Sequence, residues 1–279
     1  MIDLHTHTTA SDGSYKPRNL VKTAKEQGLQ AVAVTDHDTS AGNREALEAG
    51  VDFDIEVIPG VEISADSPWG AVHIVGLFVR LNDDEMESTL RELRRFREER
   101  NRKMIKLLVD MGIPITMEEL LMEAGGELVG RPHFAALLVK KGVVQSYQEA
   151  FDVYLKSGGK AYLDKKRLPT LDAISMILRA GGIPILAHPC TLRQKDANQF
   201  ESRLKSLLDQ GLRGIEVYYT DHSKGEEAYF ADLARRWNLL ISGGTDFHGS
   251  VKPNVILGRG FGDMAIPYEI LENLKESRI

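Results

Sequence analysis

Two pairs of metal-binding side chains lie near opposite ends of this chain. His5 and His7 are separated by one threonine, and Asp246 and His248 by one phenylalanine. Because successive side chains of a β-strand point to opposite faces, residues two apart share a face and can reach the same ion. Histidines and carboxylates together are the ligands that Zn, Mn and Fe favour in proteins. The pattern therefore predicts a metalloenzyme whose fold brings residues far apart in the sequence to one rim.

Short apolar runs alternate with amphipathic helical segments along most of the chain. This alternation is typical of parallel strands joined by crossover helices. The metal-binding residue types fall at the C-terminal ends of the apolar runs, where β/α barrels place their chemistry. A doubly wound open sheet also uses strand C-termini, but at one crevice and not at nearly every strand, so we predict an α/β fold of the TIM-like barrel type. The seven predicted strands are residues 2–7, 31–35, 56–64, 71–78, 183–187, 214–219 and 239–243.

The strand pattern is interrupted between residues 82 and 162, where helical stretches at 83–111, 117–124, 132–141 and 147–157 replace it. We therefore expect a barrel domain formed by residues 1–81 and 163–279, with residues 82–162 as a helical insertion that caps the barrel mouth. In the first of these helices, arginines and lysines alternate with glutamates. That pattern is typical of a solvated face, and contact with RNA is the less favoured alternative.

Nine residues are candidate metal ligands, which is too many for one ion. A carboxylate such as Glu62 can bridge two ions, so the set suits two or three divalent cations, with Mn, Fe and Zn all as candidates. His73 taken alone could equally be an inward-facing strand residue. Asp36 and Asp38, which flank His37, are expected to cap a helix or to hydrogen-bond a ligand histidine. The nine are His5, His7, Asp12, His37, Glu62, His73, His188, Asp246 and His248.

Six short motifs occur in the order that a known family shows. They are Leu4-His5-Thr6-His7, Ser11-Asp12-Gly13, Thr35-Asp36-His37-Asp38, Pro59-Gly60-Val61-Glu62, Ala187-His188-Pro189 and Thr245-Asp246-Phe247-His248. In these motifs the chain resembles the PHP (polymerase and histidinol phosphatase) superfamily. The resemblance implies a distorted (β/α)7 barrel with a trinuclear metal centre. It assigns one ion to His5, His7, Glu62 and Asp246, a second to Glu62, His73 and His188, and a third to Asp12, His37 and His248.

The charge and cysteine content restrict the partners and the compartment. A formal net charge of -6 argues against a broad basic surface for long nucleic acid, and no readout of DNA sequence is expected. Three divalent cations beside Asp12, Glu62 and Asp246 would still leave the site at about +3, which attracts phosphate. The single cysteine, Cys190, cannot form an internal disulfide and is expected to be a packing residue. With no charged leader before Ile2 and no apolar stretch of about 20 residues, the chain is predicted to be cytoplasmic and free of membranes.

The motif Gly130-Arg131-Pro132-His133 bears on the reaction. A cluster of cations can supply a hydroxide for attack on a phosphate ester, or equally on an amide or a lactone. Arg131 can hold phosphate with two hydrogen bonds, and His133, at the start of a predicted helix, can bind another oxygen or protonate the leaving group. Both are predicted to be catalytic and substrate-binding residues. We expect phosphate ester hydrolysis by a metal-bound hydroxide beneath a lid that excludes water.

Within the PHP superfamily, the stretches at residues 4–13 and 130–133 are most similar to stand-alone phosphoesterases that act on nucleotides. The resemblance implies a small phosphorylated substrate: a nucleoside 3′,5′-bisphosphate, a 5′-nucleotide, or short RNA trimmed from its 5′ end. Histidinol phosphate is the alternative substrate, and a non-catalytic, metal-stabilised binding module is the alternative of another class. Tyr218, Tyr219, Phe247 and Trp69 are candidates for stacking on a base. The oligomeric state is left open.

Overall fold

The computed structural model describes residues 1–125, 128–192 and 196–278. Its centre is one eight-stranded sheet with the order β1-β2-β3-β4-β6-β7-β8, in which the short β5 pairs with β3. All seven predicted strands are present, and β5 is an addition to them. The strands are β1 (Ile2–Asp3), β2 (Ala31–Val34), β3 (Glu56–Ser67), β4 (Gly70–Leu77), β5 (Leu168–Pro169), β6 (Ile183–Leu186), β7 (Gly214–Tyr219) and β8 (Leu240–Gly244).

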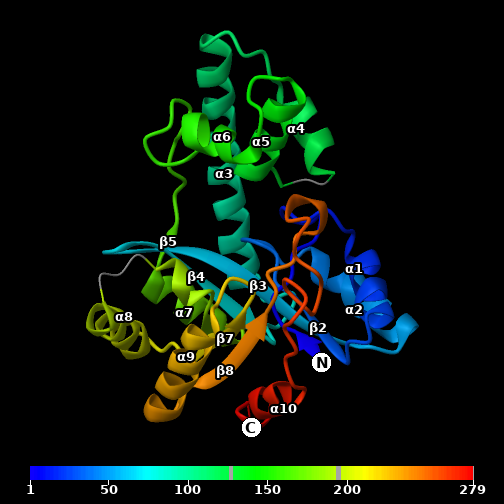
Figure 1. Cartoon of the computed structure of the whole chain (residues 1–279), viewed down its shortest axis with the longest axis vertical. Coiled ribbons are helices and arrows are strands. Elements are labelled where there is room, and N and C mark those ends of the chain that lie inside the picture. The colour runs from blue at the N-terminus through cyan, green and yellow to red at the C-terminus, as the bar shows by residue number, and fades with distance from the viewer. Residues whose placement is uncertain (126–127, 193–195, 279) are drawn as a thin grey trace.

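The sheet curls into a nearly closed barrel, seen in the lower half of Figure 1. Its two ends meet where the Leu4 amide donates to the Gly243 carbonyl at 3.1 Å and the Asp246 amide donates to the His5 carbonyl at 2.9 Å. Strands β2 and β6 are buried along their whole length, as apolar strands covered on both faces should be. The predicted α/β barrel is confirmed.

Strand β4 is reversed relative to the rest of the barrel. It runs antiparallel to both β3 and β6, whereas the other strand pairs are parallel. The connection from β3 is a tight turn, shorter than the predicted strand ends suggest, because β3 continues to Ser67 and β4 begins at Gly70. Gly70 has a φ of +114°, a conformation that glycine adopts without steric cost. The reversal brings the first half of β4 to the rim where the neighbouring strands end.

Helices cover the outside of the barrel and bury apolar faces against it. Helices α1 and α2 pack on β2, and α7, α8 and α9 share a core with β3, β4 and β7. Pro17 begins α1, where its missing N–H leaves no helical hydrogen bond unmade. The barrel helices are α1 (Pro17–Glu26), α2 (Gly42–Phe53), α7 (Thr170–Arg179), α8 (Ala197–Asp209), α9 (Lys224–Trp237) and α10 (Glu269–Glu276), with short 3₁₀ turns η2 (Pro189–Thr191) and η3 (Gly249–Val251).

A separate group of helices stands above the barrel, with α3 rising from it in Figure 1. They are α3 (Asp84–Asp110), α4 (Met117–Ala124), α5 (Arg131–Lys140), α6 (Tyr147–Ala150) and the π-helical turn η1 (Phe151–Leu155). The first half of α3 packs on the barrel core through Met86 and Leu90, whereas its second half belongs to another core with α4, α5 and α6. None of the described helices is both long and apolar enough to cross a membrane. We call residues 82–162 the helical layer.

Candidate metal centre

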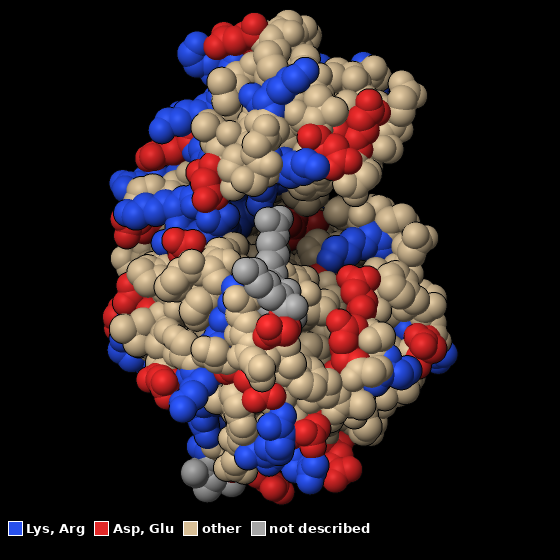
Figure 2. Space-filling model, turned by 60° about the vertical axis from the view of Figure 1, so that its left-hand side comes forward, with Lys and Arg blue, Asp and Glu red and all other residues tan. Residues whose placement is uncertain are grey.

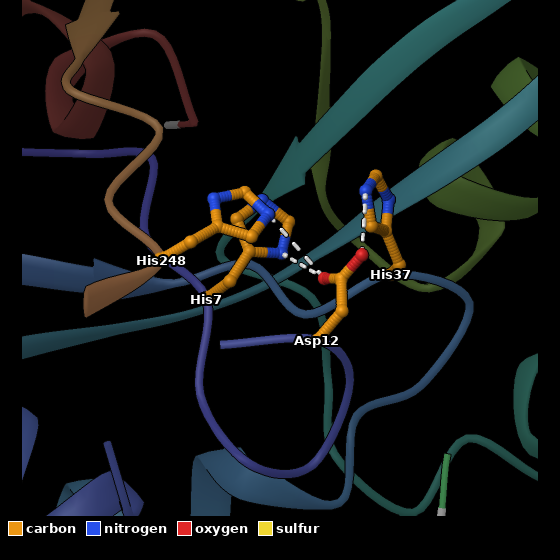
Figure 3. A group of neighbouring side chains, drawn as sticks. All are labelled: His7, Asp12, His37 and His248. Carbon is orange, nitrogen blue, oxygen red and sulfur yellow. Dashed lines mark ion pairs between the residues drawn. The ribbon is translucent and has the colours of Figure 1, made fainter. Parts of the chain in front are cut away.

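The nine candidate ligands meet at one end of the barrel. Seven of them are buried, and His37 and His73 are partly exposed. Figure 3 shows Asp12 facing three histidines, with its Oδ1 3.3 Å from His248 Nε2 and 3.7 Å from His7 Nδ1 and its Oδ2 4.0 Å from His37 Nε2. The nine candidate ligands come from the loop after β1 (His5, His7 and Asp12), the segment after β2 (His37), β3 (Glu62), β4 (His73), the end of β6 (His188) and the segment after β8 (Asp246 and His248).

Glu62 lies at the middle of this cluster. It is fully buried, and each of its two carboxylate oxygens is approached by more than one histidine ring. His73 reaches it because β4 is reversed, which places His73 beside Ser64 in the antiparallel register. The distances are 2.8 Å from Oε1 to His73 Nδ1 and 3.0 Å to His188 Nε2, and from Oε2 they are 2.8 Å to His37 Nδ1, 3.2 Å to His7 Nε2 and 3.4 Å to His5 Nε2.

Several buried polar atoms of the cluster make no hydrogen bond of acceptable geometry with any described residue, although some of them lie close together, as His37 Nδ1 and Glu62 Oε2 do at 2.8 Å. They are His5 Nε2, His7 Nε2, Asp12 Oδ1, His37 Nδ1 and Glu62 Oε2. Buried polar atoms normally have partners, and five convergent exceptions of the nitrogen and oxygen types that bind metals fit divalent cations. Three groups of side chains could each hold an ion, because within each group the ligand atoms all lie within 4.8 Å of one another. They are His5, His7 and Asp246; His7, Asp12, His37 and His248; and His37, Glu62 and His73.

Charges in the cluster shift the pKa values of its members. Burial alone would raise the pKa of Glu62, but the surrounding histidines, led by His37 and His73, hold it well below its ordinary value. Burial also opposes protonation of His7, yet the carboxylates of Asp246 and Glu62 raise its pKa to about 9. The pKa of His5 is raised as well, whereas burial lowers the pKa values of His73 and His248. Protons on His5 and His7 therefore balance part of the carboxylate charge, and cations bound between the side chains would replace those protons.

Glu216, on β7, orients two of the candidate ligands. It is fully buried, its Oε1 lies 2.8 Å from His5 Nδ1, and its Oε2 accepts from the His188 amide at 2.6 Å. A proton shared with Glu216 at Nδ1 leaves the Nε2 lone pair of His5 directed at the centre. No sequence pattern points to Glu216, because it lies within an apolar strand and next to no other motif.

Asp36 and Asp38 make no hydrogen bond to a ligand histidine, and neither is a helix cap, so the expectation for both was wrong. Asp36 accepts from the Thr8 amide at 2.7 Å, from Thr8 Oγ1 at 2.6 Å and from Ser11 Oγ at 2.5 Å. These bonds fix the loop that carries Asp12. Asp38 instead accepts hydrogen bonds from Arg97 in the helical layer and from Lys165, which follows that layer in the chain.

A cavity of about 220 Å³ adjoins the cluster, and we call it the cationic pocket. Asp12, His37 and His73 line it from the barrel. The surface is hollowed where the helical layer meets the barrel, and lysines and arginines gather there in Figure 2. The cations that line the cavity are Arg97, Arg100, Arg131, Lys165 and Arg167.

Carboxylates neutralise only part of this charge. Asp38 Oδ2 lies 2.6 Å from Arg97 Nη2 and 2.7 Å from Lys165 Nζ, and Asp164 pairs with Arg167 at 2.7 Å. Arg100 and Arg131 form no ion pair with any described residue. Burial and the neighbouring arginines lower the pKa of Arg100 to about 9, and among the described residues its guanidinium donates to Asn101 Oδ1 alone. Arg97 and Arg100 are thus buried at the pocket, not on the solvated face that was expected for α3.

A family model described as the PHP domain matches residues 3–209, well over half of the chain. This chain belongs to the PHP family. It is therefore a metal-dependent phosphoesterase, an enzyme of the hydrolase class, and its His, Asp and Glu cluster indicates divalent metal ions.

Similar proteins of known structure or curated name share nearly its whole length. This PHP chain is 36% identical over 249 residues to a 5′-3′ exoribonuclease of Haemophilus influenzae, covering 88% of this chain and 89% of the relative. It is 33% identical over 250 residues to a 3′,5′-nucleoside bisphosphate phosphatase of Chromobacterium violaceum, covering 88% and 87%. A solved structure from Bifidobacterium adolescentis, named as a metal-dependent phosphoesterase, has a TM-score of 0.87 at 30% identity and covers 99% of this chain and 96% of its own.

Arg131 and His133 both lie at the start of α5, in the helical layer of this PHP protein. Arg131 lines the cationic pocket, where its guanidinium lies 5.5 Å from the ring centre of Tyr162. His133 is buried, and its Nδ1 accepts from the Gly130 amide at 3.0 Å, so a neutral ring carries its proton on Nε2. Burial lowers the pKa of His133, which keeps the ring neutral. It is not among the residues that line the pocket.

The four aromatic rings considered for base stacking do not line the cationic pocket. Phe247 is buried in the core beneath α1 and α2. Tyr219 is buried as well, and its hydroxyl donates to Asp246 Oδ2 at 3.2 Å. Tyr218 and Trp69 pack, half-buried, against the barrel core. Cys190 is half-buried too, and burial raises the pKa of its thiol to about 12, which agrees with a packing role.

Proposed function

We propose that this enzyme hydrolyses phosphate esters of nucleotides, either nucleoside 3′,5′-bisphosphates or short RNA that carries a 5′-phosphate. Two similar proteins are named for these two activities, and nucleotides are the substrates in both names. The nine candidate ligands would hold two or three divalent ions of Mn, Fe or Zn. Residues 82–162 would form a cap domain over the mouth of a barrel domain made of residues 1–81 and 163–279.

One observation carries this proposal: a single cavity is lined both by candidate metal ligands and by five cations. Two carboxylates pair with three of these cations, which leaves Arg100 and Arg131 to attract an anion. Keeping unpaired cations buried is costly unless a ligand compensates them. A neutral amide or lactone has no use for them, whereas a substrate with more than one phosphate does.

The chain's own residues would position the phosphate. Divalent cations in the centre would lower the pKa of a water molecule and neutralise phosphoryl oxygens. Arg131 would donate two hydrogen bonds to the phosphate in the planar geometry that arginine provides. His133 lies behind the lining of the pocket, so it would reach a phosphate oxygen only by donating from Nε2 through a small shift of its ring. A charged ring would lose the hydrogen bond that Nδ1 accepts from Gly130, so we favour the donor role over that of an acid.

The helical layer would complete the pocket. It supplies Arg97, Arg100 and Arg131, while the barrel supplies Asp12, His37 and His73. Asp38, directly after His37, joins the two parts through its ion pair with Arg97 of the helical layer, and it also pairs with Lys165, which follows that layer in the chain. A site built from both parts shields the reacting phosphate from bulk water and strengthens each charge interaction there.

Histidinol phosphate fits this pocket less well than a nucleotide. It carries an ammonium group and one phosphate, so the five cations would repel one end of the molecule. A nucleoside bisphosphate or 5′-phosphorylated RNA brings a second phosphate, which can occupy the cations that do not hold the reacting one.

A substrate panel on the purified protein, with elemental analysis of its metals, tests the proposal. The panel contains adenosine 3′,5′-bisphosphate, a 5′-monophosphate, 5′-phosphorylated short RNA and histidinol phosphate. We expect kcat/KM to be highest for a substrate with two phosphates. Arg131→Ala should lower it roughly 30-fold, because a charge-assisted contact contributes about 2 kcal/mol. Arg95→Ala, on the exposed face of α3, is the matched control and should change little.

Preference for histidinol phosphate, or equal losses in the two arginine variants, would contradict the proposal. His7→Ala separates an enzyme from a binding module. Loss of hydrolysis with an unchanged circular dichroism spectrum supports catalysis at this centre, whereas full activity in His7→Ala would mean that the cluster serves another purpose.

A further inference from the structure

A second cavity, of about 260 Å³, borders the metal centre at a different ligand. Tyr219 and Lys252 line it, and both contact the same oxygen of Asp246: the Tyr219 hydroxyl at 3.2 Å and Lys252 Nζ at 2.6 Å. The cationic pocket instead reaches the centre through Asp12, His37 and His73. The centre therefore has two neighbouring cavities, which approach it through separate residues. We call the second one the Phe261 pocket, after the ring at its edge.

Phe261 is presented to solvent by a hydrogen-bonded turn. The nine phenylalanines of the chain all fall in its described part, and Phe261, 59% exposed, is the one that is not buried or half-buried. Ile256 and Gly260 exchange two main-chain hydrogen bonds of 2.7 and 2.9 Å, and the Gly262 amide donates to Arg259 at 2.8 Å. A side chain in place of Gly260, at a φ of +56°, would meet Thr220 Oγ1 at 3.1 Å. The backbone thus holds the ring in place without burying it.

The chemistry of the pocket suits a nucleobase better than another phosphate. It combines the flat Phe261 ring with the amide of Asn254 and the hydroxyl of Thr220, which can pair with the polar edge of a base. Asp221 also lines it, and its carboxylate opposes an anion there. Aromatic rings beside nucleic-acid sites stack on bases of any sequence.

We propose that the Phe261 pocket binds the nucleoside on the 3′ side of the scissile phosphate, with its base stacked on Phe261. This inference rests on the proposed function and selects among its substrates. If the first nucleotide places its 5′-phosphate in the cationic pocket, the phosphate on its O3′ lies at the metal centre. In RNA that phosphate is also bonded to the O5′ of the next nucleoside. The RNA chain must then extend from the metal centre on another side, toward Asp246.

The same bond breaks in both kinds of substrate. The oxygen of water bonds to phosphorus, the P–O3′ bond breaks, and O3′ takes a proton to become a hydroxyl group. A bisphosphate gives inorganic phosphate and leaves the Phe261 pocket empty. RNA gives a 5′-mononucleotide and a shortened chain that again begins with a 5′-phosphate, so the product is a substrate for the next round.

Two substrates that differ only in the second nucleoside test the proposal: adenosine 3′,5′-bisphosphate and a 5′-phosphorylated adenosine dinucleotide. Phe261→Ala should lower kcat/KM for the dinucleotide about tenfold, since stacking on one base contributes about 1–3 kcal/mol. The same substitution should change kcat/KM for the bisphosphate by less than about twofold. Phe261→Trp should retain the wild-type kcat/KM for the dinucleotide. Ile256→Ala is the matched control, because Ile256 is 42% exposed on the same turn and lies outside the pocket.

A binding measurement separates this inference from the proposed function. A non-hydrolysable dinucleotide with 2-aminopurine as its second base should lose fluorescence on binding the wild-type enzyme, and Phe261→Ala should abolish that quenching. Equal losses on both substrates, or undiminished dinucleotide cleavage and quenching in Phe261→Ala, would overturn the inference while the phosphoesterase function stands. If the wild-type enzyme cleaves neither substrate, the proposed function fails, and the quenching still decides whether a base stacks on Phe261.

Discussion

Replacing Glu216 by glutamine should weaken metal binding without removing a single proposed ligand. The carboxylate accepts from His5 Nδ1 at 2.8 Å and from the His188 amide at 2.6 Å, so both of its oxygens act as acceptors. Glutamine offers one oxygen and one NH2 group in the same space. If the oxygen serves His188, the NH2 group faces His5 Nδ1 and drives the histidine proton to Nε2, the atom that faces Glu62 and Asp246.

The size of the effect follows from these contacts. Either orientation of the glutamine loses one charge-assisted hydrogen bond at a fully buried site, which is worth about 1.5–3 kcal/mol. That range agrees with the roughly 10- to 100-fold loss of metal affinity seen when a carboxylate behind a ligand histidine is changed. The assay is equilibrium dialysis of Glu216→Gln against buffers of graded free Mn, with bound metal measured by mass spectrometry.

The control variant is Glu85→Gln, whose carboxylate pairs with Arg179 on the exposed surface. It should bind Mn as the wild type does. If Glu216→Gln binds Mn within about twofold of the wild type, then His5 does not depend on Glu216 for its orientation. The reasoning about its tautomer would then be refuted.

Two further substitutions test the charges around the cationic pocket. Asp38→Asn leaves Arg97 and Lys165 buried without their carboxylate, so the free energy of unfolding in urea should fall by about 3 kcal/mol, and an unchanged midpoint would contradict this. Burial would raise the pKa of Asp38, but Lys165 and Arg97 hold it below its ordinary value. The stability that the Asp38 carboxylate contributes is therefore present above about pH 4 and is lost as the pH falls further. Asp38→Asn should make this acid-induced loss of stability smaller. Arg100→Met removes a buried cation that forms no ion pair within the described part of the chain, so the melting temperature should rise while kcat/KM for a bisphosphate falls about tenfold. A lower melting temperature in this variant would show that Arg100 stabilises the fold.

The sequence was sufficient to predict the barrel and the set of residues at its rim. Strand ends are readable because apolar runs are short and the polar candidate ligands follow them directly, as at His5, His37 and His188. His73 is different, since it lies in the first half of its strand. Only the reversal of β4 explains why it meets Glu62, and strand direction is decided by pairing partners that no local pattern reveals.

The surroundings of the centre could not be predicted in the same way. Glu216 looks like an ordinary interruption of an apolar strand until the fold brings His5 and His188 within hydrogen-bond distance of it. Arg97 and Arg100 share a helix with many exposed charges, and only the packing of α3 over the barrel shows which arginines face the pocket. Such roles depend on tertiary contacts between segments far apart in the chain, whereas propensity and spacing are local.

The position of the centre also affects how the barrel stays closed. His5 and His7 belong to the first edge of the curled sheet and Asp246 and His248 to the last, and few main-chain bonds cross the seam between those edges. Joining two edges so distant along the polymer has an entropic cost that those bonds must offset. An ion bound by side chains from both edges would crosslink them and stabilise the closed barrel. Removing the metal would then weaken the contact between the two edges as well as stop the chemistry.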